Sequence, residues 1–229
     1  MSQATRSFAH DDTPSFYFQF KIKFDAFCNL ESKTEYYKQI AVFDFTMTYT
    51  STAIRDVIII EPKIFYDDRG YFFESFNLKE FQKHIGTISF VQDNESESCF
   101  GVLRGLHFQK PPFAQAKLVR VVKGKALDIA VDIRKSSPTY GQHVAIELSE
   151  ENKRSVFVPR GFAHGFVALS DHTAFQYKCD NFYEPSSEGG IYWNDPDLNI
   201  QWPVSDKDMI LSGKDLKHPL LKDFASPFD

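Results

Sequence analysis

The segment at positions 102–109 reads Val-Leu-Arg-Gly-Leu-His-Phe-Gln, and the expected fold depends on it. Its branched and aromatic side chains favour a β-strand, but Arg104 and His107 interrupt the apolar run. Strict alternation would place these two side chains on opposite faces of the strand. Because glycine accommodates a β-bulge, we expect Gly105 to turn Arg104 towards the face that carries His107. The alternative is a structural core histidine held by one backbone hydrogen bond.

A second stretch, Pro-Arg-Gly-Phe-Ala-His-Gly-Phe, occupies positions 159–166. Its Pro-x-Gly-x-x-His order resembles the second half of the cupin signature, and Gly101 and His107 fit the first half. Gln109 replaces the second histidine of that signature, and no glutamate follows at the required distance. Because transition-metal sites usually draw on several histidine or carboxylate ligands, we predict no metal. A metal-dependent cupin that uses His107, Gln109 and His164 is the alternative.

Short β-rich runs, separated by Gly, Pro, Asp or Ser, follow one another from position 56 onwards. They occupy residues 57–60, 118–122, 127–133, 144–148 and 155–158. Many short strands at close spacing indicate a sandwich or a barrel. Lys-Gly-Lys at 123–125 lies between two alternating runs and predicts a tight hairpin connection. Together with the cupin-like motifs, these runs predict an all-β fold, a cupin-like antiparallel jelly-roll β-barrel with a few short helices.

Residues 78–85 carry the signals of a helix. Asn77 is placed to cap its N-terminus, Glu80 occupies the capping-box position, and Gly86 follows its end. Three apolar side chains share one face of this helix: Leu78, Phe81 and Ile85. No glycine-rich phosphate loop opens a helix, so the sequence does not support a dinucleotide-binding fold.

The overall composition excludes several classes of function. The 229 residues carry a formal net charge of -5, and the pI is near 5.8, so no basic field draws the chain to nucleic acid or to anionic membranes. No run of eighteen apolar residues or secretory segment is present. The three cysteines Cys28, Cys99 and Cys179 suggest neither a disulfide framework nor a four-thiolate zinc site. We therefore expect a cytoplasmic protein.

The first 46 residues differ in pattern from the remainder. Apolar side chains alternate with polar ones over residues 16–25, which is typical of a strand. This segment is an added edge strand, a dimer element, or a stretch that precedes a start at Met47. We therefore expect an N-terminal extension over residues 1–46 and a cupin-like domain over residues 47–229.

Cationic and phenolic side chains accompany these motifs in a chain that is acidic overall. The cations are Arg69, Arg104, Lys117 and Lys214. If they converge, they form an anion site, since arginine suits phosphate oxygens and lysine suits a developing enolate oxygen. A solvated surface charge is the simpler interpretation for Lys214 alone. Tyr177 and Tyr183 offer a proton donor and an aromatic face for stacking a base.

Residues 56–215 closely resemble the dTDP-4-dehydrorhamnose 3,5-epimerases, cupin-fold enzymes of deoxysugar biosynthesis. Besides the two stretches above, the match includes Asp-Arg-Gly at 68–70, Phe-Glu-Ser at 73–75, Phe-Val-Gln-Asp-Asn at 90–94, Lys-Leu-Val-Arg at 117–120, Trp-Asn-Asp-Pro at 193–196 and Leu-Ser-Gly-Lys-Asp at 211–215. The resemblance implies a homodimeric isomerase that works without a cofactor. It would invert C3 and C5 of dTDP-4-keto-6-deoxyglucose in dTDP-L-rhamnose biosynthesis.

The resemblance also implies a role for each matching side chain. His107 is the general base, Asp215 pairs with it, Tyr177 is the general acid, and Lys117 binds substrate and stabilises the enolate. Tyr183 stacks on thymine. The other substrate-contacting positions are Arg69, Glu74, Gln92, Asp93, Asn94, Arg104, His164, Glu188 and Lys214.

Two further alternatives remain besides a metal-dependent cupin. A non-catalytic module that binds sugar nucleotides would not need His107, Tyr177 and Asp215, yet all three are present. A related epimerase that inverts a single carbon would carry the same residues. The position of the acid decides between one inversion and two, and the sequence does not determine that position.

Overall fold

The computed structural model describes residues 46–229, which fall into two compact units. The larger unit joins residues 47–62 to residues 76–229. The described part of the smaller unit consists of Thr46 and residues 63–75. The expected strand at 16–25 lies outside the described residues, so the N-terminal extension stays a prediction.

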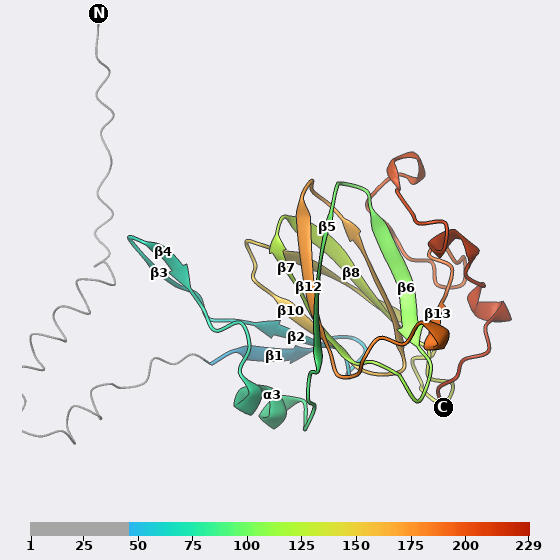
Figure 1. The fold of residues 1–229 in the computed structure, drawn as a ribbon, viewed down its shortest axis with the longest axis horizontal. Helices are drawn as coiled ribbons and strands as arrows, with labels where there is room; N and C mark the ends of the chain where they lie inside the picture. The colour runs from blue at the N-terminus through green and yellow to red at the C-terminus, as the bar shows by residue number, and fades with distance from the viewer. Residues whose placement is uncertain (1–45) are drawn as a thin grey trace, which may run out of the picture. The chain divides into compact units, whose positions relative to one another are not determined.

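Two antiparallel sheets form the larger unit (Figure 1). The first has the strand order β1-β2-β10-β7-β12-β5, and the second has the order β13-β6-β11-β8-β9. The strands are β1 (Thr48–Ser51), β2 (Ile58–Glu61), β5 (Gln92–Ser98), β6 (Leu103–Gln109), β7 (Lys117–Lys123), β8 (Lys125–Asp132), β9 (His143–Ser149), β10 (Ser155–Val158), β11 (Phe162–Ala168), β12 (Thr173–Cys179) and β13 (Glu188–Gly190). Each run from position 56 onwards that the sequence predicted to be a strand overlaps one of them, which confirms the all-β class.

The main apolar core receives side chains from both sheets. Phe166 of β11 and Phe175 of β12 stack with ring centroids 4.0 Å apart and an interplanar angle of 2°. Val119, Ala130 and Ile146 belong to the same buried cluster. Burial of each large side chain contributes about 1.5–3 kcal/mol. This core holds β7 and β12 of the first sheet against β8, β9 and β11 of the second, and β7, β11 and β12 also carry polar side chains of the site described below.

The expected tight hairpin at residues 123–125 is wrong. β7 pairs with β10 and β12, whereas β8 pairs with β9 and β11, so the turn leads from one sheet to the other. Gly124 has φ +74°, and a Cβ there would lie 3.1 Å from Thr173 Cα. Glycine therefore suits this crossing, but local alternation indicates only where strands lie and not which strands pair.

The predicted helix is present as α3 (Leu78–His84). The Asn77 side chain accepts hydrogen bonds from the backbone N–H groups of Lys79 at 3.0 Å and Glu80 at 3.2 Å, which confirms the expected cap. Phe81 is fully buried. Leu78 is 49% exposed, so the expected inward face does not extend to the first helical residue.

The strand pairing confirms the bulge expected at Gly105. His107 lies opposite His164, but Arg104 lies opposite Phe166, so three steps along β6 match two along β11. Gly105 has φ +148°, and a Cβ there would lie 2.6 Å from Gly165 Cα. The extra residue in β6 interrupts the alternation of its side chains. Arg104 and His107, three positions apart, can therefore lie on the same face.

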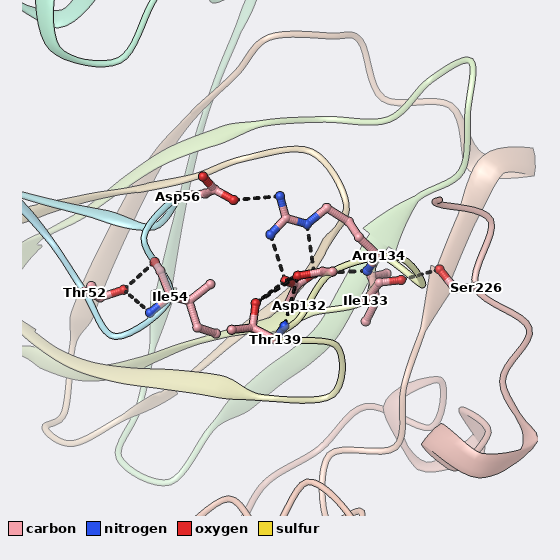
Figure 2. A network of polar contacts seen from close by, with 9 residues as sticks. Thr52, Ile54, Asp56, Asp132, Ile133, Arg134, Thr139 and Ser226 are labelled. Carbon is pink, nitrogen blue, oxygen red and sulfur yellow. Dashed lines mark hydrogen bonds and ion pairs between the residues drawn. The ribbon is translucent and has the colours of Figure 1, made fainter.

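A buried carboxylate organises the connection that follows β8 (Figure 2). Asp132 accepts hydrogen bonds from Ser137 Oγ at 2.5 Å, Thr139 Oγ1 at 2.6 Å and Arg134 Nη2 at 2.7 Å. Arg134 also donates to Asp56 at 2.7 Å. Burial opposes ionisation of Asp132, but the hydrogen bonds from Arg134 and its neighbours lower its pKa to about 2. This network links β8 to the residues that precede β2.

The smaller unit contains a short hairpin of β3 (Phe65–Asp67) and β4 (Gly70–Phe72). Arg69 lies in its turn, and its guanidinium forms an ion pair with Asp67 at 2.5 Å. Tyr66 and Tyr71 face each other across the hairpin with ring centroids 6.3 Å apart. The turn is thus stabilised by a local ion pair and by a cross-strand aromatic contact.

Candidate active site

Two hollows in the larger unit, of about 270 and 520 Å³, are lined by three of the same residues: His107, Lys117 and Tyr177. These side chains come from β6, β7 and β12, so both sheets contribute to the site. Arg104 also lines the larger hollow, as expected from the bulge at Gly105. The structure thus brings together a histidine, a lysine, a phenol and a guanidinium.

His107 and Asp215 form a close polar pair in the site. His107 Nε2 lies 2.6 Å from Asp215 Oδ1, and Ser212 Oγ donates to Asp215 Oδ2 at 2.9 Å. Asp215 begins the 3-10 helix η3 (Asp215–Lys217) and is 3% exposed. Burial works against its charge, but the hydrogen bonds from His107 and Ser212 hold the pKa of Asp215 below its usual value. The carboxylate therefore stays ionised and orients the imidazole.

Tyr177 and Lys117 lie together on paired strands. Tyr177 is opposite Val119 of β7, and Lys117 Nζ lies 5.8 Å from the centre of the Tyr177 ring. Burial raises the pKa of Tyr177, so the phenol keeps its proton. Burial also lowers the pKa of Lys117, because a charged ammonium loses hydration there. An anion that forms beside Lys117 would favour its charged form, because it would replace part of the lost hydration.

His164 lines the larger hollow and is paired with a buried carboxylate. Its Nε2 lies 2.7 Å from Asp128 Oδ1, and the side chains of the two residues are 7% and 1% exposed. His107 is directly opposite His164 in the pairing of β6 with β11, but its side chain is 28% exposed. His164 is therefore the more enclosed of the two histidines.

Polar side chains line the smaller hollow. Gln92 Nε2 donates to Asn94 Oδ1 at 3.0 Å, and Gln92 Oε1 accepts from the backbone of Tyr183 at 3.0 Å. The Tyr183 hydroxyl donates to Glu188 at 3.0 Å, and Lys214 forms an ion pair with the same carboxylate. Burial opposes the charge of Glu188, but its bonds to Lys214 and Tyr183 lower its pKa. Lys214 is therefore not an isolated surface charge.

Three predicted contact residues do not line either hollow. Asp93 forms an ion pair with Lys178 at 2.9 Å, because alternation along β5 turns it away from Gln92 and Asn94. Arg69 and Glu74 belong to the smaller unit, where Arg69 pairs with Asp67. The roles of all three in substrate binding stay predictions.

Gln109 has a structural role that its place in the cupin-like motif did not reveal. Its amide nitrogen donates to the carbonyls of Phe113 at 2.7 Å and Phe182 at 3.1 Å, and its oxygen accepts from the backbone of Glu184 at 2.7 Å. The Gln109 amide is thus hydrogen-bonded to three backbone groups, which argues against a metal site formed by His107, Gln109 and His164. Gln109 instead holds two loops at the margin of the smaller hollow.

Sequence reasoning also missed neighbours of the site residues. Asp128 orients His164 and Ser212 orients Asp215, whereas His218 only lies near the pair formed by His107 and Asp215. The sequence offered a signal only for Ser212, which is three residues before Asp215. The other two are brought in by pairing or packing that connects distant parts of the chain.

This two-sheet antiparallel fold, with a histidine–carboxylate pair, a phenol and a lysine around a polar hollow, defines a cupin-like enzyme that acts by proton transfer. The family model described as dTDP-4-dehydrorhamnose 3,5-epimerase matches residues 51–223. The chain belongs to this family and is an isomerase.

Individual relatives agree with this assignment. A dTDP-4-dehydrorhamnose 3,5-epimerase of Salmonella typhimurium is 56% identical over 176 residues, which cover 76% of this chain and 96% of the relative. The crystal structure of a Legionella pneumophila 3,5-epimerase in complex with dTDP-4-keto-L-rhamnose is 49% identical, with a TM-score of 0.76 over 79% of this chain and 95% of that one. These similarities confirm the expected cupin-like jelly roll.

A relative with narrower specificity has the same fold. A 3′-monoepimerase of Streptomyces bikiniensis, solved in complex with dTDP-quinovose, is 34% identical and gives a TM-score of 0.72 over 75% of this chain and 87% of that one. Fold alone therefore does not distinguish one inversion from two. Within residues 46–229, no helix combines the length and apolar character needed to cross a membrane.

Proposed function

We propose that this chain inverts C3 and C5 of dTDP-4-keto-6-deoxyglucose with His107 as the general base. The observation that carries the proposal is the 2.6 Å contact between His107 Nε2 and Asp215 Oδ1 beside a hollow that Tyr177 and Lys117 also line. Both carbons flank the C4 ketone, so their hydrogens can leave as protons. The reaction therefore requires no redox cofactor.

The contact with Asp215 determines which nitrogen of His107 acts. A neutral imidazole carries one N–H donor and one acceptor nitrogen. Because Asp215 accepts from Nε2, the lone pair resides on Nδ1, and that nitrogen takes the substrate proton. The ionised carboxylate then stabilises the imidazolium, in the manner of an orienting group behind a general base.

Lys117 and Tyr177 complete the proton transfers. Removal of a proton beside the ketone creates an enolate, whose oxygen Lys117 stabilises through its positive charge. Tyr177, whose burial keeps the phenol protonated, returns a proton from the opposite face of the ring. The same steps act first at C5 and then at C3.

The polar residues around the hollows hold the nucleotide part of the substrate. Arg104 and Lys214 supply positive charge for the diphosphate, and Tyr183 offers a half-exposed ring for stacking on thymine. Gln92 and Asn94 supply amide groups at the smaller hollow. Binding energy from these contacts keeps the sugar in place for two successive inversions. Arg69, Glu74 and Asp93 are assigned to the substrate by the family resemblance.

An epimerase that inverts only one carbon is the second candidate, favoured by the similarity to the 3′-monoepimerase. One experiment separates the two. The protein is incubated with dTDP-4-keto-6-deoxyglucose in deuterated water, and NMR follows deuterium at C3 and C5. Inversion and deuterium at both carbons support the proposal, whereas change at one carbon supports the alternative. No exchange at either carbon contradicts both.

We also propose that the enzyme is a cytoplasmic homodimer. The family resemblance implies the dimer, and the acidic composition agrees with a small-molecule substrate and not with nucleic acid. Light scattering of the full chain measures the dimer directly. A mass of about 26.4 kDa, that of one chain, would contradict it.

A further inference from the structure

His218 is a buried histidine that the proposed reaction does not use. Its side chain is 11% exposed, and its Nε2 has no hydrogen-bond partner among residues 46–229. That nitrogen lies 3.9 Å from Asp215 Oδ1, the oxygen that also contacts His107. The rings of His107 and His218 meet edge to face, with centroids 5.6 Å apart. A buried polar atom without a partner is destabilising, so its position calls for an explanation.

The backbone around His218 holds its ring close to the other two side chains. A Cβ at Gly190 would lie 2.5 Å from His218 Nε2, so only glycine leaves room for the ring at that position. The next residue, Pro219, accepts a hydrogen bond from the backbone N–H of Tyr192 at 2.8 Å. β13 and the segment that follows it therefore confine His218 beside Asp215.

We infer that His107, Asp215 and His218 bind a divalent transition-metal cation, Zn²⁺ above all, and that the bound cation inhibits the enzyme. One donor atom from each side chain lies within 4.8 Å of the other two. Two imidazole nitrogens and one carboxylate oxygen are a ligand set that zinc accepts, with bonds of about 2.0–2.2 Å.

The present spacing requires only a small adjustment to form this site. Ligand atoms at such bond lengths around a tetrahedral ion lie roughly 3.3–3.5 Å apart. His107 Nε2 lies 2.6 Å from Asp215 Oδ1 and would move out, whereas His218 Nε2 lies 3.9 Å from that oxygen and would move in. His107 lines both hollows, so a water molecule can reach the fourth position.

Inhibition follows from the tautomer of His107 and rests on its proposed role as base. A cation on Nε2 takes the lone pair of that nitrogen, and the proton of the neutral ring must then reside on Nδ1. Nδ1 can no longer accept a proton from the substrate. The cation also draws Asp215 away from its hydrogen bond with His107. The enzyme would be active without the metal and inactive with it.

The experiment separates metal binding from catalysis. Metal-free full-length protein is titrated with Co²⁺ alone, whose visible absorption reports coordination by nitrogen, and Zn²⁺ is then added as a competitor. We expect one equivalent to bind. The variant His218→Asn should weaken Co²⁺ binding at least about tenfold, whereas His172→Asn changes an exposed histidine paired with Glu97 and should not affect it.

Activity measured with and without Zn²⁺ completes the test. In chelator, His218→Asn should keep its activity within about threefold of the parent, and its half-inhibiting Zn²⁺ concentration should rise at least about tenfold. No binding by the parent chain, or equal binding by His218→Asn, overturns the site. Stoichiometric binding that leaves activity unchanged supports the site but contradicts the role of His107 as base. If His218→Asn fails to fold, NMR of the histidine rings in the parent chain shows whether Zn²⁺ shifts His107 and His218 together.

Discussion

His164 and Asp128 lie 2.7 Å apart, between Nε2 and Oδ1, on the neighbouring strands β11 and β8. They form a second histidine–carboxylate pair next to that of His107 and Asp215. Burial distinguishes the two histidines, because the side chain of His164 is 7% exposed and that of His107 is 28% exposed. The pair of His164 and Asp128 holds its ring in place, whereas the pair of His107 and Asp215 leaves the His107 ring accessible to a substrate.

Removal of His164 should destabilise the fold as well as weaken binding. In His164→Ala the Asp128 carboxylate remains buried without its partner, which costs about 3–5 kcal/mol for a buried pair. Urea unfolding at a fixed protein concentration measures the loss. In the double variant His164→Ala and Asp128→Ala the unpaired charge is gone, so part of that free energy should return. Strictly additive losses would contradict a coupled pair.

Substitution of His107 should lower turnover strongly while the chain still folds. His107→Asn removes the proposed base, so kcat should fall by about 10²–10⁴. Asp215 keeps its hydrogen bond from Ser212, so the free energy of unfolding should fall less than in His164→Ala. His172→Asn is the matched control, because His172 is an exposed histidine at φ +54°, a conformation that asparagine tolerates. A fall of less than tenfold in the His107 variant would assign the base to another residue.

The phenol of Tyr177 should matter more for completion of the inversion than for removal of the proton. In Tyr177→Phe the ring beside Lys117 remains, but no acid returns a proton to the opposite face. Deuterium should still enter at C5, while formation of the epimer should slow by about 10²–10⁴. Tyr140→Phe is a control outside both hollows. Equal loss of exchange and epimerisation would show that Tyr177 only shapes the hollow.

The network around Asp132 should contribute strongly to stability (Figure 2). Asp132→Ala leaves Arg134 without its buried partner and should lower the free energy of unfolding by about 3–5 kcal/mol. Asp56→Ala removes the exposed end of the same network and should cost at most about 1 kcal/mol. Urea unfolding compares the two variants. Similar losses of stability in the two variants would show that burial of Asp132 does not increase its contribution.

The same carboxylate should make stability depend on pH in the acid range. Its pKa is about 2 in the folded chain, below the usual value of 3.8. A lowered folded pKa gives stability that is complete above about pH 4 and is lost as the pH falls towards 2. Between pH 4 and pH 2 the free energy of unfolding should therefore fall more steeply with pH in the parent chain than in Asp132→Ala. The same pH dependence in both chains would mean that other carboxylates determine the acid stability.

Local sequence was sufficient for much of the fold because its signals involve near neighbours. The cap at Asn77 depends on the N–H groups of residues two and three positions further along. The bulge was expected because Gly105, which has no Cβ, lies between the polar residues Arg104 and His107 of one strand. The same stretch also pointed to His107. In contrast, the turn at Gly124 was predicted as a hairpin, because a strand pattern does not specify its pairing partner.

By itself the sequence determined the strand segments, the helix cap and the family, and it pointed to His107 as the proposed base, since each depends on residue type and short spacing. The family resemblance implied that Asp215 pairs with His107, but only the tertiary structure shows the distances and the further neighbours. Asp215 reaches His107 across 108 positions in the chain, Asp128 pairs with His164 across 36, and His218 packs against Gly190. Such contacts join residues that are far apart in the chain. They form only when the whole chain folds, and the propensities of neighbouring residues do not specify them.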